Sequence, residues 1–357
     1  PKEPHDIRIW CLGNELDGPW QVGHKTADEY GRLAAETARA MRMVDPSLEL
    51  VACGSSNSSM PTFASWEATM LEHCYDIVDY VSLHSYYDPL PTDLPTFLAS
   101  GVDLDRAIEA IVATADHVGA RKKSRRRLQL SVDEWNVWHQ SRFKGQNTLT
   151  YGDEPALIED VYDVADAVVV GSLLITLLRH ADRVAIGCQA QLVNVIAPIL
   201  TRDGGPAWRQ TIFHPFAQVT QWARGEVLRL ETSAEHYSTE KYGDVSILDV
   251  TATYDEENGT VTVLCVNRST TEPVHLDADV RAFPGCRVEA ATVLHDTDHH
   301  AHNTERHPDL ITPRNHQDVA VVEDRLQGVL PPVSWTVIRL STKQSTHQAH
   351  RPTGEMS

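Results

Sequence analysis

Two stretches of the sequence end an apolar run in a carboxylate, an arrangement that can do acid–base or nucleophilic chemistry. The run from Ile7 to Leu12 stops at Gly13-Asn14-Glu15, and a turn-forming Asp-Gly-Pro follows shortly after. The run from Leu128 to Val132 leads into Asp133-Glu134, with tryptophans close behind. In barrels of parallel strands, catalytic residues lie at the C-terminal ends of the strands. We therefore predict that Glu15 and Glu134 form a catalytic pair.

Two carboxylates that face one gap can hydrolyse a glycosidic bond. One, with a raised pKa, protonates the leaving oxygen, while the other attacks the anomeric carbon and forms a covalent glycosyl-enzyme. A retaining reaction needs the carboxyl groups about 5 to 5.5 Å apart. Either glutamate alone is a weak indication, because most glutamates are solvated. The prediction rests on their combination, since both end apolar strands, lie among aromatic residues and share one alternating pattern.

The composition indicates a chain that can bury a core, and it excludes several classes of partner. Of the 357 residues, 41% are hydrophobic and 23% are charged, which argues against global disorder. The formal net charge of −19 argues against nucleic acid and anionic membranes, because phosphate binding needs local positive charge. One basic run, residues 121–127, is interpreted as a solvated loop. The apolar stretch 165–178 is too short to span a bilayer.

Cysteine and histidine spacing gives no firm metal motif. None of the 6 cysteines forms a Cys-x-x-Cys pair, and most lie in apolar runs, as buried thiols do in a reducing compartment. A histidine-rich stretch, residues 295–307, leaves a metal site open as an alternative, but it has no ordered ligand spacing. We interpret it as a solvated loop, and two-carboxylate chemistry requires no cofactor.

Strand and helix patterns alternate over the first 224 residues. The helix from Thr26 is the best defined, because Thr26 and Glu29 form a capping box. The predicted strands are 7–12, 48–53, 78–87, 128–132 and 183–190, and the predicted helices are 26–44, 63–74, 104–118, 156–180 and 208–224. These five strand-plus-helix units predict a parallel sheet covered on both faces. A closed barrel needs eight units and roughly 250 residues, so five fall short of closure.

The pattern changes to antiparallel strands from Glu226 onward. The segments 245–254 and 260–267 alternate apolar and polar residues around an Asp-Glu-Glu-Asn-Gly turn, which predicts a hairpin. Further strands are predicted at 274–276, 287–294, 319–322 and 334–340. We therefore predict a catalytic barrel part over residues 1–224, a β-sandwich over 225–341 and a disordered tail over 342–357. The loop 140–155 is predicted to act as a lid or rim.

Three motifs resemble the α-L-arabinofuranosidases of glycoside hydrolase family 51. They lie at residues 13–21, 84–87 and 133–138, and they read Gly-Asn-Glu-x-Asp-Gly-Pro-Trp-Gln, His-Ser-Tyr-Tyr and Asp-Glu-Trp-Asn-Val-Trp. The resemblance implies an α/β fold, a (β/α)8 TIM barrel followed by an all-β, jelly-roll-like sandwich. It places the acid/base at the end of barrel strand 4 and the nucleophile at the end of strand 7.

The same resemblance implies a role for each candidate site residue. Glu15 is the acid/base and Glu134 the nucleophile, with Asn14 on the sugar 2-hydroxyl. The others are Tyr86 as a hydrogen-bond donor to Glu134, Trp138 as a wall of the pocket and Gln191 as a contact to the sugar. Strand alternation places His84 on the same face as Tyr86, although a buried core histidine remains the alternative. Trp20 and Trp135 are either sugar platforms or core residues.

If Glu15 ends strand 4, then strands 1 to 3 and the sugar-binding residues on them are absent from this sequence. We therefore expect a fragment that lacks the N-terminal part of the barrel. Its strand edges at 7–12 and 183–190 would be unpaired, and such edges invite aggregation. We predict little or no activity for the isolated chain.

The expected function is that of a retaining exo-α-L-arabinofuranosidase acting on terminal residues of arabinan, arabinoxylan and their oligosaccharides. Two alternatives stay open: another retaining glycosidase of the same clan, such as a xylosidase or endoglucanase, or a non-catalytic carbohydrate-binding remnant. By resemblance the protein is expected to be a homo-oligomer, as a hexamer, and cytoplasmic. No nucleic acid or membrane partner is expected.

Overall fold

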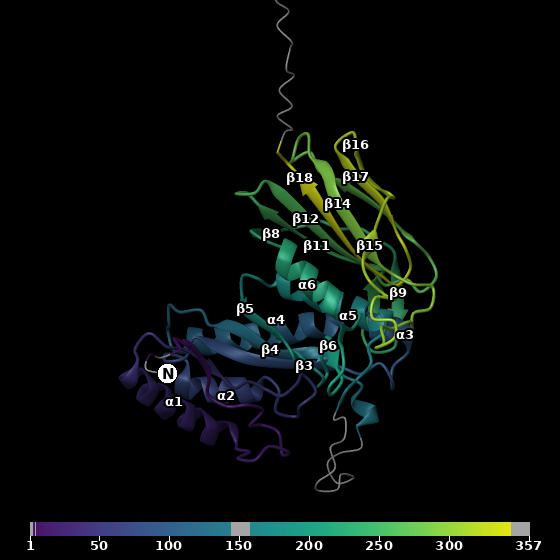
Figure 1. Ribbon diagram of the computed structural model, residues 1–357. Helices are drawn as coiled ribbons and strands as arrows, with labels where there is room; N and C mark the ends of the chain where they lie inside the picture. Colours follow the sequence, from purple (N-terminus) through teal and green to yellow (C-terminus); the bar gives the residue numbers. More distant parts are fainter. Residues whose placement is uncertain (1–2, 4, 144–157, 344–357) are drawn as a thin grey trace, which may run out of the picture.

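The computed structural model describes residues 3, 5–143 and 158–343. A layer of parallel strands with its helices comes first, and antiparallel sheets follow from Glu226 onward (Figure 1). Most of the predicted lid, and all but the first two residues of the predicted tail, lie outside the described residues.

Five parallel strands form the sheet that carries the predicted site. They are β1 (Ile9–Cys11), β2 (Glu49–Ala52), β3 (Tyr80–Tyr87), β4 (Gln129–Val137) and β5 (Val184–Gln189), and they pair in sequence order. All four pairings are parallel, so each connection must cross over the sheet, and helices supply the crossovers. The result is a half-barrel sheet in which the strand ends follow one another along a single rim.

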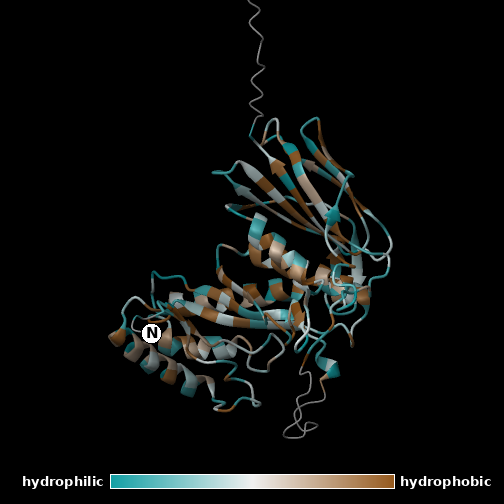
Figure 2. Ribbon diagram, in the orientation of Figure 1, coloured by the Kyte–Doolittle hydropathy of each residue, from teal (hydrophilic) through white to brown (hydrophobic). Residues whose placement is uncertain are grey.

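Six α-helices belong to this part of the described chain. They are α1 (Ala27–Val44), α2 (Ser65–Cys74), α3 (Leu94–Leu98), α4 (Gly101–Arg121), α5 (Val164–Arg179) and α6 (Phe213–Trp222). The predicted start of α1 is confirmed, because Thr26 and Glu29 cap it reciprocally. The most deeply buried helix is α5, whose residues are buried from Val164 to Leu177. Figure 2 colours the ribbon by hydropathy, and hydrophobic residues, drawn brown, recur along the helices and strands of both parts of the chain.

Two helix predictions are wrong at their first residues. The helix predicted from Ala156 begins at Val164, because Asp163 and Asp166 form a capping box there. The helix predicted from Trp208 begins at Phe213, and Trp208 instead lies in strand β7 (Ala207–Arg209), which pairs with β6 (Ile199–Thr201).

The strands after Glu226 build two antiparallel sheets that share one core. The larger has the order β15 (Arg314–Asn315), β14 (Arg287–Leu294), β18 (Ser334–Ser341), β12 (Thr260–Asn267), β11 (Leu248–Asp255) and β8 (Glu226–Leu228). The smaller has the order β13 (Val274–Asp279), β17 (Arg325–Leu330) and β16 (Val319–Val322). A short hairpin, β9 (His236–Thr239) and β10 (Gly243–Ser246), lies beside them. The hairpin predicted around residues 255–259 is confirmed, whereas β17 was not predicted.

The two parts of the chain share buried contacts. Trp335 on β18 packs on α5 at Gly171, where a Cβ atom would lie 2.4 Å from the indole ring. A buried group of charges also crosses this contact. Asp249 on β11 accepts hydrogen bonds from Arg268 and from Ser172 of α5, and Arg179 lies 2.9 Å from its other oxygen. We call Ser172, Arg179, Asp249 and Arg268 the interface network. Because the core runs across residue 224, the division into domains there stays a prediction.

Candidate active site

The loop after β1 presents Glu15, and two features fix that loop. Gly13 has a φ of +149°, and a Cβ atom there would lie 2.8 Å from Leu16. Asp17 is buried and accepts hydrogen bonds from both the backbone and the hydroxyl of Ser56, in the loop after β2. Glu15 itself has a φ of +47°, in the left-handed region. The ends of two neighbouring strands thus set the position of this carboxylate.

A β-bulge in β4 turns two consecutive acids toward the same histidine. Ser82 pairs with Ser131 and His84 pairs with Glu134, so two residues of β4 lie opposite one residue of β3. In a regular strand, neighbouring side chains would point to opposite faces. Here His84 Nε2 lies 3.2 Å from Asp133 Oδ1, and His84 Nδ1 lies 3.7 Å from Glu134 Oε2.

The structure brings the predicted pair together around His84. Its Nδ1 atom lies 3.0 Å from Glu15 Oε1, and the hydroxyl of Tyr86 donates a 2.8 Å hydrogen bond to Glu134 Oε2. A carboxylate oxygen of Glu15 and one of Glu134 lie within 4.8 Å of each other. We call Glu15, His84, Asp133 and Glu134 the active-site cluster. His84 belongs to this cluster and is not an isolated core histidine.

His84 carries the positive charge of the cluster. Its burial alone would lower the pKa, because burial disfavours the charged ring. The hydrogen bonds to Asp133 and Glu15, together with the charges of Glu134 and Asp133, outweigh burial and raise the pKa to about 10. At neutral pH the ring is therefore an imidazolium that donates from Nδ1 to Glu15, while its Nε2 atom forms an ion pair with Asp133.

The pKa of Glu15 is lowered, whereas a raised pKa is expected of the general acid. Burial raises the pKa, but hydrogen bonds from His84, Trp20 and Gln21 lower it further than burial raises it. The indole Nε1 of Trp20 lies 3.0 Å from Glu15 Oε2, and the side-chain amide of Gln21 lies 3.4 Å from the same oxygen. The expectation of a raised pKa is therefore wrong for Glu15 in this structure, because three donors stabilise its ionised form.

The structure separates the two tryptophans that the sequence left undecided. Trp135 is fully buried on β4, whereas Trp20 is 57% exposed. Trp20 lies against the backbone of Gly18, where a Cβ atom would come 2.4 Å from the indole. Glycine therefore lets the indole reach Glu15 and keep part of its surface open. Trp135 is a core residue, and Trp20 is the one that borders the site.

The remaining predicted residues fall into two groups. Trp138 packs edge-on against Tyr86, with ring centroids 5.4 Å apart, so it borders the cluster. Asn14 and Gln191 are exposed, and within the described chain no side-chain hydrogen bond joins either residue to the cluster. The loop that starts at Gln191 is held by buried Asn136, whose amide lies 2.6 Å from the carbonyl oxygens of Ala190 and Ile196. Sequence reasoning missed this anchoring residue and the contact between Asp133 and His84.

Metal binding is not favoured by these donors. In the described part of the chain, the single group of three ligand residues within mutual reach is Glu15, His84 and Glu134. A protonated imidazole has no free lone pair, so a metal would first have to displace the proton of His84. The histidine-rich stretch instead packs on the start of α5, where His300 lies 2.9 Å from Asp163.

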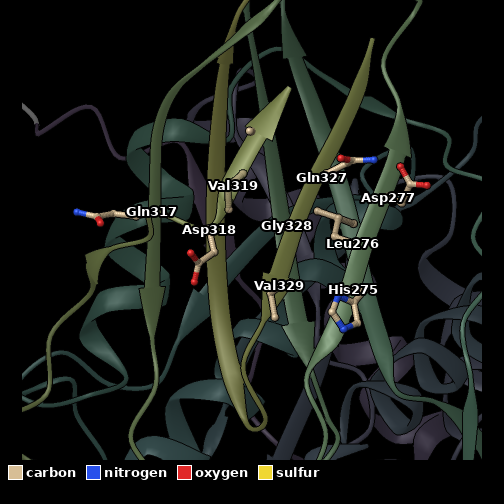
Figure 3. Close-up of a pocket in the computed structure, with 10 residues that line it drawn as sticks. His275, Leu276, Asp277, Gln317, Asp318, Val319, Gln327, Gly328 and Val329 are labelled. Carbon is tan, nitrogen blue, oxygen red and sulfur yellow. The ribbon is translucent and has the colours of Figure 1, made fainter. Parts of the chain in front are cut away.

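A separate hollow of about 470 Å³ lies on the small sheet of β13, β17 and β16. Figure 3 shows that the polar side chains around it, such as Gln317 and Gln327, do not converge on one point. Asp277, on its rim, is paired with the guanidinium of Arg325 at 2.6 Å. This hollow therefore lacks the convergent polar groups expected of a ligand site.

No helix among the described residues has the length and apolar character required to cross a bilayer. Comparison with protein families matches residues 133–334 to the α-L-arabinofuranosidase C-terminal domain.

Two curated relatives and one solved structure extend the match to almost the whole chain. An intracellular exo-α-(1→5)-L-arabinofuranosidase of Streptomyces lividans is 51% identical over 98% of this chain and 53% of the relative. The enzyme of the same name from Halalkalibacterium halodurans is 49% identical over 96% of this chain and 68% of the relative. A family 51 α-L-arabinofuranosidase from Bifidobacterium longum superposes with a TM-score of 0.90 at 41% identity, covering 95% of this chain and 68% of that structure.

The chain thus spans about half of one relative and about two thirds of the other two proteins. The sequence motifs, the half-barrel sheet and these similarities agree. The chain belongs to the α-L-arabinofuranosidases of glycoside hydrolase family 51.

Proposed function

We propose that this chain carries the catalytic pair of a retaining exo-α-L-arabinofuranosidase that removes terminal α-L-arabinofuranosyl residues from arabinan, arabinoxylan and their oligosaccharides, and that it acts on the α-(1→5) linkages of arabinan. The observation that carries the proposal is the approach of Glu15 and Glu134 to within 4.8 Å across His84. That spacing suits a direct attack on the sugar, with no water between the carboxylates. The names of the S. lividans and H. halodurans relatives support the choice of sugar and linkage.

In the first step, Glu134 attacks the anomeric carbon while Glu15 gives a proton to the departing oxygen. The bond from the anomeric carbon to that oxygen breaks, and an ester to Glu134 forms. In the second step, ionised Glu15 takes a proton from water, and the water oxygen displaces Glu134. The lowered pKa of Glu15 suits the second step, and the proton used in the first step has to be taken up as the sugar enters.

The residues around the pair have supporting roles in this proposal. Tyr86 orients Glu134 through its 2.8 Å hydrogen bond, and Trp20 offers an open indole face beside Glu15 to the leaving sugar. Asn14 bonds the sugar 2-hydroxyl, while Trp138 and Gln191 line the sugar pocket. No cofactor takes part.

We also propose that the five parallel strands occupy places 4 to 8 of a (β/α)8 TIM barrel, followed by a jelly-roll-like sandwich. Ile9 and Trp10 on β1 are each 45% exposed, as expected of a strand that a further strand would cover in a complete barrel. The isolated chain is therefore expected to have little activity. The active protein is proposed to be intracellular, as its relatives are named, and a homo-oligomer of hexameric form.

The test uses the intact gene product, meaning this chain with any residues encoded on either side of it. Hydrolysis of aryl α-L-arabinofuranoside should greatly exceed hydrolysis of aryl β-xyloside, and proton NMR should detect the α-anomer of arabinose first. Glu134→Ala and Glu15→Ala should each abolish most of the turnover. A xyloside preference would favour another glycosidase of the clan, and full activity in both variants would indicate a non-catalytic role.

A further inference from the structure

Asp133, which precedes the proposed nucleophile in the sequence, contacts His84 and Ser131. Its Oδ1 atom lies 3.2 Å from His84 Nε2, and its Oδ2 atom accepts a 3.1 Å hydrogen bond from the hydroxyl of Ser131. Its side chain is 16% exposed, whereas that of Glu134 is 32% exposed. Asp133 thus sits behind His84, on the side of the ring away from Glu15.

The β4 bulge is what makes this contact possible. Because two residues of β4 lie opposite one residue of β3, the side chains of Asp133 and Glu134 approach the two nitrogens of the same ring. His84 is only 3% exposed, so its orientation depends on these partners and not on water.

We propose that Asp133 is a positioning residue that holds the Nε2 edge of His84, so that the Nδ1 edge faces the oxygens of Glu15 and Glu134. The inference rests on the proposed function and names a further residue of that site. A protonated ring in this place lets two carboxylates approach each other in spite of their like charge. Without a carboxylate on Nε2, the ring loses its proton more readily and can turn away from Glu15.

The titratable groups that face the ring or its partners come from several elements. Glu15 follows β1, Tyr86 lies on β3 and Glu134 lies on β4. Cys11 on β1 lies 3.6 Å from Asp133, and the charge of Asp133 also acts on the thiols of Cys188 on β5 and of buried Cys53, which follows β2. Burial and the charge of Asp133 raise the pKa values of these thiols.

The pH dependence of hydrolysis of the glycosyl-enzyme distinguishes the role of Asp133 from that of Glu15. When Glu134 is esterified, it carries no charge, and Glu15 and Asp133 are the carboxylates that remain around His84. Hydrolysis of this intermediate needs ionised Glu15, so raising the pH does not remove the base. A fall in the hydrolysis rate at high pH then reports the loss of the proton from His84.

The experiment measures kcat against pH for 2,4-dinitrophenyl α-L-arabinofuranoside with the intact gene product. The good leaving group makes hydrolysis of the intermediate the slow step. In Asp133→Asn, the alkaline limb should move down by roughly one to three pH units, as expected when one neighbouring carboxylate loses its charge. Asp133→Glu keeps the charge and should keep the alkaline limb near that of the wild type, with a lower maximal rate.

A matched control lies at the other end of the same sheet. Asp79, just before β3, pairs with Arg126 at 3.0 Å and accepts a 2.9 Å hydrogen bond from the backbone of Leu50. Asp79→Asn should lower stability without moving the limb. If the wild type is active and the alkaline limb of Asp133→Asn lies at the same pH as that of the wild type, the inference alone is overturned. If the wild type shows no turnover, both the proposed function and the inference are overturned.

A second measurement tests the inference on the wild-type protein if the Asp133→Asn variant does not fold. The His84 ring of the wild-type protein is followed by NMR with histidine-selective ¹⁵N labelling and assigned by its loss in His84→Gln. A doubly protonated ring at pH 8 supports the inference. A neutral ring at that pH overturns it.

Discussion

Two buried groups of charges, the active-site cluster and the interface network, are built in opposite ways. The cluster surrounds one imidazolium with three carboxylates, and it keeps openings to solvent at Glu134 and Trp20. The network surrounds one carboxylate, Asp249, with two guanidinium groups and a serine, and the side chain of Asp249 is 1% exposed.

We interpret the cluster as a group placed to react and the network as a group placed to stabilise the fold. Where several carboxylates surround a titratable ring, these groups can gain and lose protons near working pH, and acid–base catalysis depends on such proton transfers. Arginines do not lose their protons in proteins, so the network keeps its charge at every working pH. We therefore expect changes in the cluster to act on turnover and changes in the network to act on stability.

The largest effect is expected at Glu134. Glu134→Gln keeps the shape of the side chain and removes the proposed nucleophile, so kcat of the intact gene product should fall by roughly 10⁴-fold or more. The free energy of unfolding should change by less than about 1 kcal/mol, since a partly exposed carboxylate is lost from a group with excess negative charge. Steady-state kinetics and urea unfolding check both results. A loss of activity below tenfold would remove Glu134 from the mechanism.

Arg268 should show the reverse behaviour. Arg268→Met leaves Asp249 buried with one of its two cations, so the free energy of unfolding should fall by roughly 3 to 5 kcal/mol, while kcat per folded molecule stays within about twofold. The control is Arg325→Met, which breaks an exposed pair with Asp277 and should leave the free energy of unfolding nearly unchanged. Equal losses in the two variants would contradict the distinction between the network and surface pairs.

Alkaline pH should weaken the cluster and spare the network. His84 has a folded-state pKa of about 10, above its ordinary value of 6.5. The stability that this shift provides is fully present below pH 6.5 and is lost as the pH rises through 10. The free energy of unfolding should therefore decline over this range in the wild type and decline less in His84→Gln. Parallel curves for the two proteins would show that His84 carries no such shift.

The smallest effect is expected at Trp20. Trp20→Phe removes the 3.0 Å hydrogen bond to Glu15, so the pKa of Glu15 should rise toward its ordinary value. The acidic limb of hydrolysis of the glycosyl-enzyme should move to higher pH, with at most about a tenfold loss of rate, as expected for a single hydrogen bond to a charged group. Trp135→Phe, in the core, serves as the control and should leave the limb in place.

Local sequence patterns predicted the elements that short-range chemistry decides. Thr26 and Glu29 mark the start of α1, and the apolar runs before Glu15 and Glu134 mark strands whose ends meet at one rim. Prediction failed at the start of α5, where the run from Ala156 was extended through Asp163, which in fact caps the helix. A capping box at residues 163 and 166 was present in the sequence but was masked by the apolar residues around it.

Other features of the site depend on pairing between distant segments. The β4 bulge arises from the register between β3 and β4, so the sequence Ser-Val-Asp-Glu alone does not show that Asp133 and Glu134 meet the same ring. Trp20 and Trp135 each lie within a few residues of a proposed catalytic carboxylate, and only packing distinguishes the exposed indole from the buried one. The pKa of Glu15 was missed for the same reason, because His84 is 69 residues away in sequence.

The account depends most on Glu134 and Glu15 facing one sugar ring with Glu134 as the attacking group. A 2-deoxy-2-fluoro arabinofuranosyl reagent with a good leaving group should trap the glycosyl-enzyme of the intact gene product. Peptide mapping by mass spectrometry should then place the sugar ester on Glu134, and Glu134→Gln should remain unlabelled. A label on Glu15, on Asp133 or on a residue outside the cluster would contradict the account.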